Sequence, residues 1–251
     1  MLPLERTPGY DNIPGRAKTH IASLAQRSLS TQIFPECVLV LQNVPEDSIS
    51  DGGLHFLIFN ETDLDKWKAP DEIWKNFPYY LSGYDYENRP IWVWEWGKWP
   101  LRSYLERGEN MDEIISRHVD QMLWHMYKFW GPQTNSEGER VKEVNVLIDL
   151  EGYNMSQLGN IPAVNFLIRK LRLVTIVARF SHVTAFVNTN FFGETILNIV
   201  KPVMGAAFGS FEIYGTNSKN WEAKLLKHFP RDQIPLWYGG SKDHQPVKVF
   251  G

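Results

Sequence analysis

The amino-acid sequence predicts an α/β protein with a mostly parallel sheet. Between positions 90 and 230, apolar segments typical of strands alternate with helical segments of ten or more residues. This alternation is the pattern of β–α–β crossovers. The segment "VNVLIDL" at 144–150 is apolar almost throughout, as expected of a strand whose two faces are both buried. No linker-like composition interrupts this stretch, so a single domain is expected to contain it.

The composition narrows the function classes. Of the 251 residues, 43% are hydrophobic and 22% charged, which is ordinary for a globular protein. The formal net charge of -3 gives no basic surface, so nucleic acid is not an expected partner. Cys37 is the single cysteine, which excludes an internal disulfide and suits a reducing compartment. The oligomeric state stays open.

The start of the chain has no apolar core of a secretion signal. No window of the sequence approaches the roughly 18 apolar residues that a membrane-spanning helix needs. We therefore expect a cytoplasmic protein that meets membranes only at their surface.

The first clear elements lie between residues 68 and 99. The segment "KAPDEIWKNF" predicts a helix that begins at Pro70, with acidic residues in its first turn. The segment "SGYDYENRP" at 82–90 predicts a turn that leads into the strand "RPIWVWEWGKW" at 89–99. Side chains two apart in a strand share a face, so Trp92, Trp94 and Trp96 are expected to form one row of indoles.

The later elements follow from periodicity and end signals. A long helix is predicted over 110–130, where Asn110 can cap the start and Gly131-Pro132 ends it. It carries one apolar stripe, made of Ile115, Val119, Met122, Met126 and Phe129. Further helices are predicted over 162–180, 191–205 and 220–229, and strands over 144–150, 183–189 and 211–215.

A search for catalytic and metal motifs finds none. The sequence has no G-x-S-x-G, G-x-G-x-x-G, P-loop, H-E-x-x-H or cysteine pair, so no catalytic residue, metal site or cofactor is expected. His118 and His125 lie seven apart on one predicted helix and are expected to be helix-surface or interface residues. Asp149 and Glu151 follow a strand at its carboxyl end. They can serve as an acid–base pair, although such residues more often cap the next turn.

Four separated blocks of the chain resemble the CRAL-TRIO domain family, which includes retinaldehyde-, tocopherol- and phosphatidylinositol-binding proteins. In order, they are "WKAPDEI" with "YLSGYDYENRPIWVWEWGKW", "VLIDLEGYNMSQL", "FVNTNFFGETILNIVKPVMG" and "LLKHFPRDQIPLWYGGS". The resemblance spans roughly residues 67 to 241. It implies a CRAL-TRIO-like lipid-binding domain at 67–251 and a shortened N-terminal helical region at 1–66.

The resemblance implies a sheet that forms the floor of an apolar ligand cavity, covered by helices. The helix around 191–203 would be a mobile lid, and the protein would carry a lipid or isoprenoid and exchange it with membranes. The tryptophans would form the floor, Met and Phe would adapt to ligand shape, and Asn188 would orient a polar end. The residues predicted to line the cavity are Trp92, Trp94, Trp96, Met122, Met126, Val146, Ile148, Phe166, Phe186, Asn188, Phe191, Phe192, Ile196 and Val200.

One departure from the family pattern bears on the ligand. Phosphatidylinositol-binding members hold the headgroup with a glutamate and a lysine, and here Arg179 and Ser210 align with those positions. We therefore expect an apolar ligand such as a carotenoid, retinoid or tocopherol. The alternatives are phospholipid transfer, a lipid-sensing regulatory module, or a lipid or sugar hydrolase that uses Asp149 or Glu151.

Overall fold

The structure is a computed structural model, and it describes residues 64–128, 133–154, 157 and 161–250. Except for its last three residues, the predicted N-terminal region at 1–66 lies outside this part of the chain. The same is true of Phe129, the last residue of the predicted apolar stripe.

A six-stranded sheet organises the described residues. Its strands are β1 (Tyr79–Tyr84), β2 (Pro90–Trp94), β3 (Val144–Asp149), β4 (Ser181–Val187), β5 (Phe211–Ile213) and β6 (Lys248–Phe250). Their order across the sheet is β5-β4-β3-β2-β1-β6. Strands β2 to β5 pair in parallel, whereas β1 is antiparallel to both of its neighbours. The predicted α/β class with a mostly parallel sheet is confirmed.

Helices connect the parallel strands, as the crossovers require. The α-helices in the described residues are α4 (Asp71–Asn76), α5 (Leu101–Leu105), α6 (Glu109–Lys128), α8 (Ile161–Ala178), α9 (Phe191–Met204) and α10 (Glu222–His228). Short 3-10 helices are η3 (Trp96–Lys98), η4 (Gly205–Ser210), η5 (Ser218–Asn220), η6 (Arg231–Gln233) and η7 (Leu236–Tyr238). None of the helices described is long and apolar enough to cross a bilayer.

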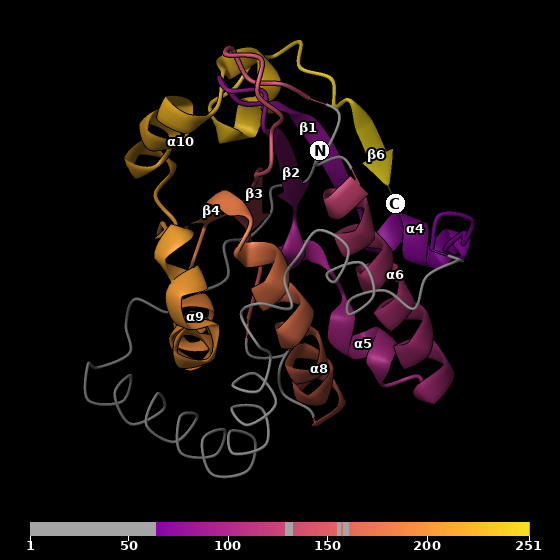
Figure 1. Cartoon of the computed structure of the whole chain (residues 1–251). Helices are drawn as coiled ribbons and strands as arrows, with labels where there is room; N and C mark the ends of the chain where they lie inside the picture. The colour runs from indigo at the N-terminus through magenta and orange to yellow at the C-terminus, as the bar shows by residue number, and fades with distance from the viewer. Residues whose placement is uncertain (1–63, 129–132, 155–156, 158–160, 251) are drawn as a thin grey trace, which may run out of the picture. The chain divides into compact units, whose positions relative to one another are not determined.

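The two faces of the sheet bury separate apolar cores. Helices α5, α6, α8 and α9 contribute to the core on one face, together with Trp92, Trp94 and Ile148 from the strands. Helix α10 and the turns η6 to η7 cover the other face, where Val93 and Leu147 point. Figure 1 shows α10 on one side of the strands and α5, α8 and α9 on the opposite side.

Two local predictions need correction. The predicted turn over 82–90 begins later, because residues 79–84 form β1, which is buried along nearly its whole length and so shows no alternation to mark it. The turn itself is built by Asp85, whose Oδ1 accepts hydrogen bonds from the backbone N–H groups of Glu87 (2.9 Å) and Arg89 (2.7 Å). The tryptophan strand ends at Trp94, so Trp96 belongs to η3 instead.

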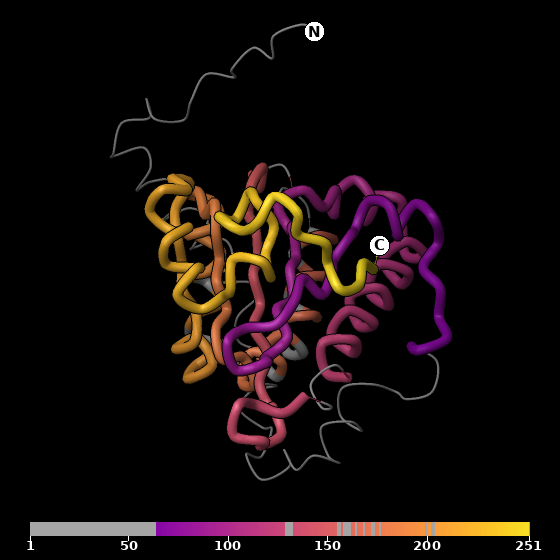
Figure 2. The backbone as a smooth tube through the Cα atoms, turned by 90° about the horizontal axis from the view of Figure 1, so that it is seen from above, coloured from indigo at the N-terminus to yellow at the C-terminus, as the bar shows by residue number. Residues whose placement is uncertain are grey.

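The C-terminal residues, for which no element was predicted, extend the sheet. Strand β6 pairs with β1 through Tyr79↔Phe250, Tyr80↔Val249 and Leu81↔Lys248. In Figure 2 the C-terminal segment in yellow runs beside the indigo and violet stretch that includes β1. The rings of Tyr79 and Phe250 stack, with centroids 5.2 Å apart and planes 5° from parallel.

Candidate functional site

An apolar pocket lies between the sheet and the helices that cover its first face. Its volume is about 120 Å³, and its surface is almost entirely carbon. We call it the apolar pocket. It is lined by Trp94, Trp96, Trp99, Leu101, Val119, Leu123, Met126, Val146, Ile148, Phe166, Leu167, Lys170, Leu171, Val174, Val177, Ala178, Thr184, Phe186, Ile196, Leu197, Val200, Met204 and Phe211.

Three adjacent strands supply the floor of the apolar pocket. The parallel register places Trp94 beside Ile148, and Ile148 beside Phe186. Two residues back along the strands, Val146 lies beside Thr184. Side chains two apart share a face, so strands β3 and β4 each contribute two residues to the same floor. The alternation in "VNVLIDL" and "VTAFVNT" therefore sorts pocket residues from residues of the opposite core.

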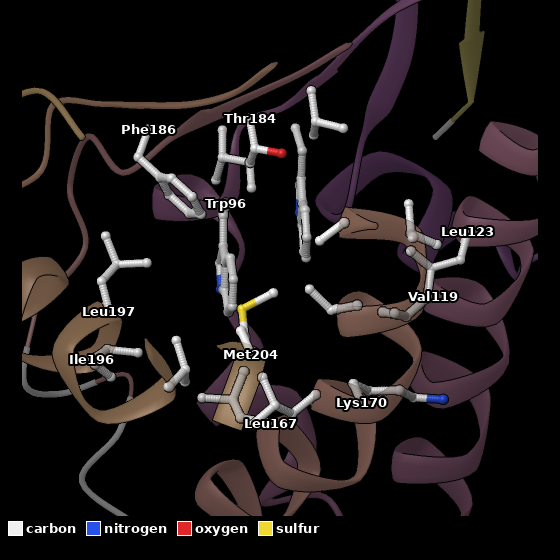
Figure 3. Close-up of a pocket in the computed structure, with 18 of the residues that line it drawn as sticks. Trp96, Val119, Leu123, Leu167, Lys170, Thr184, Phe186, Ile196, Leu197 and Met204 are labelled. Carbon is white, nitrogen blue, oxygen red and sulfur yellow. The ribbon is translucent and has the colours of Figure 1, made fainter. Parts of the chain in front are cut away.

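Helices α6, α8 and α9 form the walls. Figure 3 shows Val119 and Leu123 on one side of the pocket and Ile196 and Leu197 on the other, with Leu167 and Met204 between them. On α9 the inward residues are apolar, whereas Glu194, Asn198 and Lys201 are exposed at steps of four and three. This is the pattern of a helix with one buried face and one solvent face.

The start of α9 is fixed by one asparagine. The side-chain oxygen of Asn190 accepts hydrogen bonds from the backbone N–H groups of Phe192 (3.0 Å) and Gly193 (3.1 Å), which caps the helix. Its Nδ2 donates to the carbonyl oxygen of Tyr153 at 2.6 Å. The cap therefore ties α9 to the loop that follows β3.

Most of the residues predicted to line a cavity do line this pocket. They are Trp94, Trp96, Met126, Val146, Ile148, Phe166, Phe186, Ile196 and Val200. Trp96 reaches it from η3: its ring stacks on that of Trp94, with centroids 4.6 Å apart and planes 5° from parallel. That they contact a ligand remains a prediction.

Five predicted residues lie elsewhere. Trp92 is fully buried, and its ring centroid lies 6.3 Å from that of Tyr79 and 5.8 Å from that of Phe250. Met122 is also fully buried in the core of α6 and the sheet.

Phe191 and Phe192 form the first turn of α9, are half-buried and contact each other edge to face, with ring centroids 5.6 Å apart. The fifth, Asn188, follows β4 with a positive φ of 54°. Its Nδ2 donates to Asp149 instead of facing the pocket.

Apart from Phe166, the residues of α8 that line the pocket were not predicted, and they include Leu167, Lys170, Leu171 and Val174. The segment 161–178 is apolar on most sides of the helix, so periodicity does not indicate which side faces the sheet. Trp99 and Thr184 were also missed. The strand alternation that identified Phe186 would have identified Thr184, two residues earlier.

Asp149, a candidate acid or base, is held in a buried hydrogen-bond network. Its Oδ1 accepts from the backbone N–H of Glu151 (2.8 Å) and from Asn188 Nδ2 (2.9 Å). Its Oδ2 accepts from the hydroxyl of Tyr238 at 2.9 Å. Burial, with the nearby carboxylate of Asp149, raises the pKa of Tyr238 well above its usual value. The network joins β3 to the loops after β4 and at η7, and Glu151 itself is exposed.

The two helix histidines lie at an interface within the protein. His118 is 1% exposed, and its Nε2 lies 2.8 Å from the carbonyl oxygen of Phe77. His125 is half-buried, and its Nδ1 lies 2.8 Å from the hydroxyl of Tyr79. They tie α6 to the region around β1. Within the described part of the chain, no three His, Cys, Asp or Glu residues group as metal ligands.

Comparison with known proteins gives two findings. The model of the CRAL/TRIO domain family matches residues 75–240. The crystal structure of Sfh5 is similar at 10% sequence identity, with a TM-score of 0.48 and coverage of 73% of this chain. The matched region spans 66% of that structure's chain.

Proposed function

The chain belongs to the CRAL/TRIO domain family, whose members bind hydrophobic lipid ligands, and on that premise we propose that the apolar pocket holds such a ligand for exchange with membranes. The observation that carries the proposal is a pocket of almost pure carbon surface enclosed by β2, β3, β4, α6, α8 and α9. Such a surface favours a largely apolar ligand over a polar substrate.

The energetics favour a carrier. Burying an alkyl chain is worth ~0.8 kcal/mol per CH₂ relative to water, and a bilayer offers nearly the same. Transfer between a membrane and the pocket is therefore close to balanced, and neither side holds the ligand irreversibly. Pocket shape then decides which ligand stays.

The size of the pocket supports the proposal that α9 acts as a lid. At about 120 Å³, the pocket is smaller than the ~300–1,000 Å³ of typical small-molecule sites. A long-chain ligand therefore needs a wall to move outward. We propose that α9 is the wall that moves. Its start is held by the Asn190 cap, and the residues that cover the pocket lie further along the helix, at Leu197, Val200 and Met204.

The ligand proposed is an isoprenoid such as a carotenoid, retinoid or tocopherol. Arg179 and Ser210, which align with headgroup-binding charges of other family members, do not line the pocket. Arg179 is exposed after α8, and the hydroxyl of Ser210 donates to the carbonyl oxygen of Ala207 at 3.1 Å. The domain is proposed to act without catalysis, because the bonds that hold Asp149 give it a structural task.

Transfer between vesicles tests the proposal. Phosphatidylcholine donor vesicles carry α-tocopherol, a carotenoid or phosphatidylinositol, and the amount that reaches acceptor vesicles is measured with and without protein. We expect transfer of the isoprenoids and little transfer of phosphatidylinositol. Preferential transfer of phosphatidylinositol would overturn the ligand class, and transfer of none would overturn the carrier function.

Two neighbouring residues on α9 give matched variants. Leu197 is 6% exposed and lines the pocket, whereas Asn198 is exposed. Leu197→Asn is expected to lower transfer at least several-fold, because it places a polar amide against the apolar part of the ligand. Asn198→Asp, on the outer face, is expected to leave transfer unchanged. Circular dichroism establishes that both variants are folded.

A further inference from the structure

One charged side chain stands among the residues that line the apolar pocket. Lys170 on α8 is 7% exposed, and its Nζ donates to Asp120 Oδ1 on α6 at 2.6 Å. The side chains of Lys170 and Asp120 are 9% and 27% exposed. In Figure 3 the Lys170 chain runs along the pocket, and its nitrogen points away from Trp96, toward the seam between α8 and α6.

The ammonium group of Lys170 has donors to spare. A lysine carries three N–H donors, and Asp120 is its one hydrogen-bond acceptor in the part of the protein that the structure describes. The ring of Phe166 lies 6.0 Å from Nζ and accepts no hydrogen bond. Burial lowers the pKa of Lys170 and raises that of Asp120, so both partners have lost solvation that the pair does not fully replace.

A second lining residue offers another unmet donor. Trp94 is 6% exposed, and its indole Nε1 is buried without an acceptor among the described residues. The hydroxyl of Thr184, by contrast, is satisfied by Ser181 Oγ at 2.8 Å. The polar groups of the pocket wall whose hydrogen bonding is incomplete are therefore donors. A buried donor without an acceptor destabilises the protein.

We propose that the pocket selects a lipid whose head is an uncharged hydrogen-bond acceptor, such as a ketone or ester oxygen, and that this head reaches the seam between α8 and α6, where Lys170 donates to it. The inference rests on the proposed function and names its ligand class. A pure hydrocarbon leaves the donors of Lys170 unmet. A carboxylate head is disfavoured, because Asp120 already balances the ammonium charge and would repel a second anion nearby.

Three probes of equal chain length test the inference: methyl tridecyl ketone, pentadecane and pentadecanoate. Each is offered in phosphatidylcholine vesicles, and mass spectrometry measures the amount that the purified protein removes. Relative to its level in the vesicles, the ketone is expected to be taken up about tenfold better than the hydrocarbon, as for one hydrogen bond to a charged donor. The carboxylate is expected to be taken up least.

Two adjacent residues supply the variant and its control. Lys170→Met keeps the length of the side chain and removes the charge, so the preference for the ketone is expected to disappear. Arg169 pairs with Asp112 of α6, as Lys170 pairs with Asp120, but does not line the pocket. Arg169→Met is therefore expected to keep the preference.

A buried aspartate without its partner can destabilise the fold. The double variant Asp120→Leu with Lys170→Met removes both charges together and is expected to behave like Lys170→Met. An unchanged ketone preference in the folded variants, equal uptake of all three probes by the wild type, or a preference for the carboxylate would overturn the inference alone. Uptake of none of the three would overturn the proposed function, and the inference with it.

Discussion

The indole rings of Trp94 and Trp96 stack nearly parallel, with centroids 4.6 Å apart, although the two residues belong to different elements. Trp94 is the last residue of β2, and Trp96 is the first of η3. The change of element depends on Gly97, where a Cβ atom would lie 2.1 Å from the carbonyl oxygen of Glu151. The close approach of η3 to the loop after β3 thus holds the second indole on the pocket.

Variants of Trp92 and Trp96 distinguish effects on ligand binding from effects on stability. Trp92→Leu is expected to cost about 2–3 kcal/mol of stability, because the indole is fully buried in solid packing. Its ligand affinity is expected to stay near that of the wild type. Trp96→Leu removes a half-buried ring and its stack, at about 1 kcal/mol, but takes away part of the pocket wall.

Urea unfolding and ligand titration of both variants measure the two effects. A Trp92→Leu variant that loses binding as strongly as Trp96→Leu would contradict the position assigned to the pocket.

Neighbouring residues of β3 test whether the two sheet faces differ in packing. Val146→Phe adds volume toward the pocket and is expected to change stability by less than about 1 kcal/mol, because empty space receives the ring. Leu147→Phe adds volume to the opposite core, where Leu147 is fully buried, and is expected to cost about 1–3 kcal/mol. Thermal unfolding measures both. Equal destabilisation would mean that the space under α9 cannot accept a ring.

The folded protein is expected to lose stability as the pH falls, because unfolding allows His125 to bind a proton. Burial lowers its pKa to about 4 from the usual value of 6.5. Lys248, Asp65, Lys128 and His118 also act on it. Between these two pH values the unfolded chain binds a proton that the folded protein does not, so acid favours unfolding. The contribution is present above pH 6.5 and is lost progressively as the pH falls toward 4, on the order of 2 kcal/mol after allowing for partial exposure.

His125→Gln is expected to flatten the fall in stability over this pH range. His182, whose side chain is 42% exposed, gives the control, and His182→Gln should keep the wild-type slope. Urea unfolding at a series of pH values makes the comparison. A slope that survives in His125→Gln would assign the proton uptake to another group.

The network around Asp149 gives a prediction about the hydrolase alternative. Tyr238→Phe removes the hydroxyl that donates to Asp149 Oδ2 and is expected to cost about 2 kcal/mol, as for a hydrogen bond to a charged group. Asp149→Asn is expected to lower stability without changing ligand binding. Esterase and glycosidase assays on the wild type and Asp149→Asn complete the test, and turnover that vanishes in the variant would favour the hydrolase.

The sequence predicted the sheet because β3 and β4 carry strong local signals. Near-continuous apolar runs such as "VLID", bounded by turn residues, favour a buried strand. Strand β1 was missed since both of its faces are buried, which leaves its sequence without alternation. Strand β6 was missed because three residues carry too little pattern, and its place depends on pairing with β1.

The floor of the pocket was more predictable than its walls. Val146, Ile148 and Phe186 follow from strand alternation, once one face is assigned to the pocket. Lys170 could not be predicted in this way, because a lysine on a helix is normally expected to lie at the surface. Its burial depends on Asp120, fifty residues earlier on α6, and local patterns do not reveal that pairing.

The most direct test of the proposed carrier function is the content of the pocket in purified protein. An organic extract of the wild type and of Val146→Phe, matched for folded protein, is analysed by mass spectrometry and by its absorption spectrum. We expect a hydrophobic molecule in near-stoichiometric amount from the wild type and little of it from Val146→Phe. Equal amounts from both proteins, or none from the wild type after exposure to lipid vesicles, would contradict it.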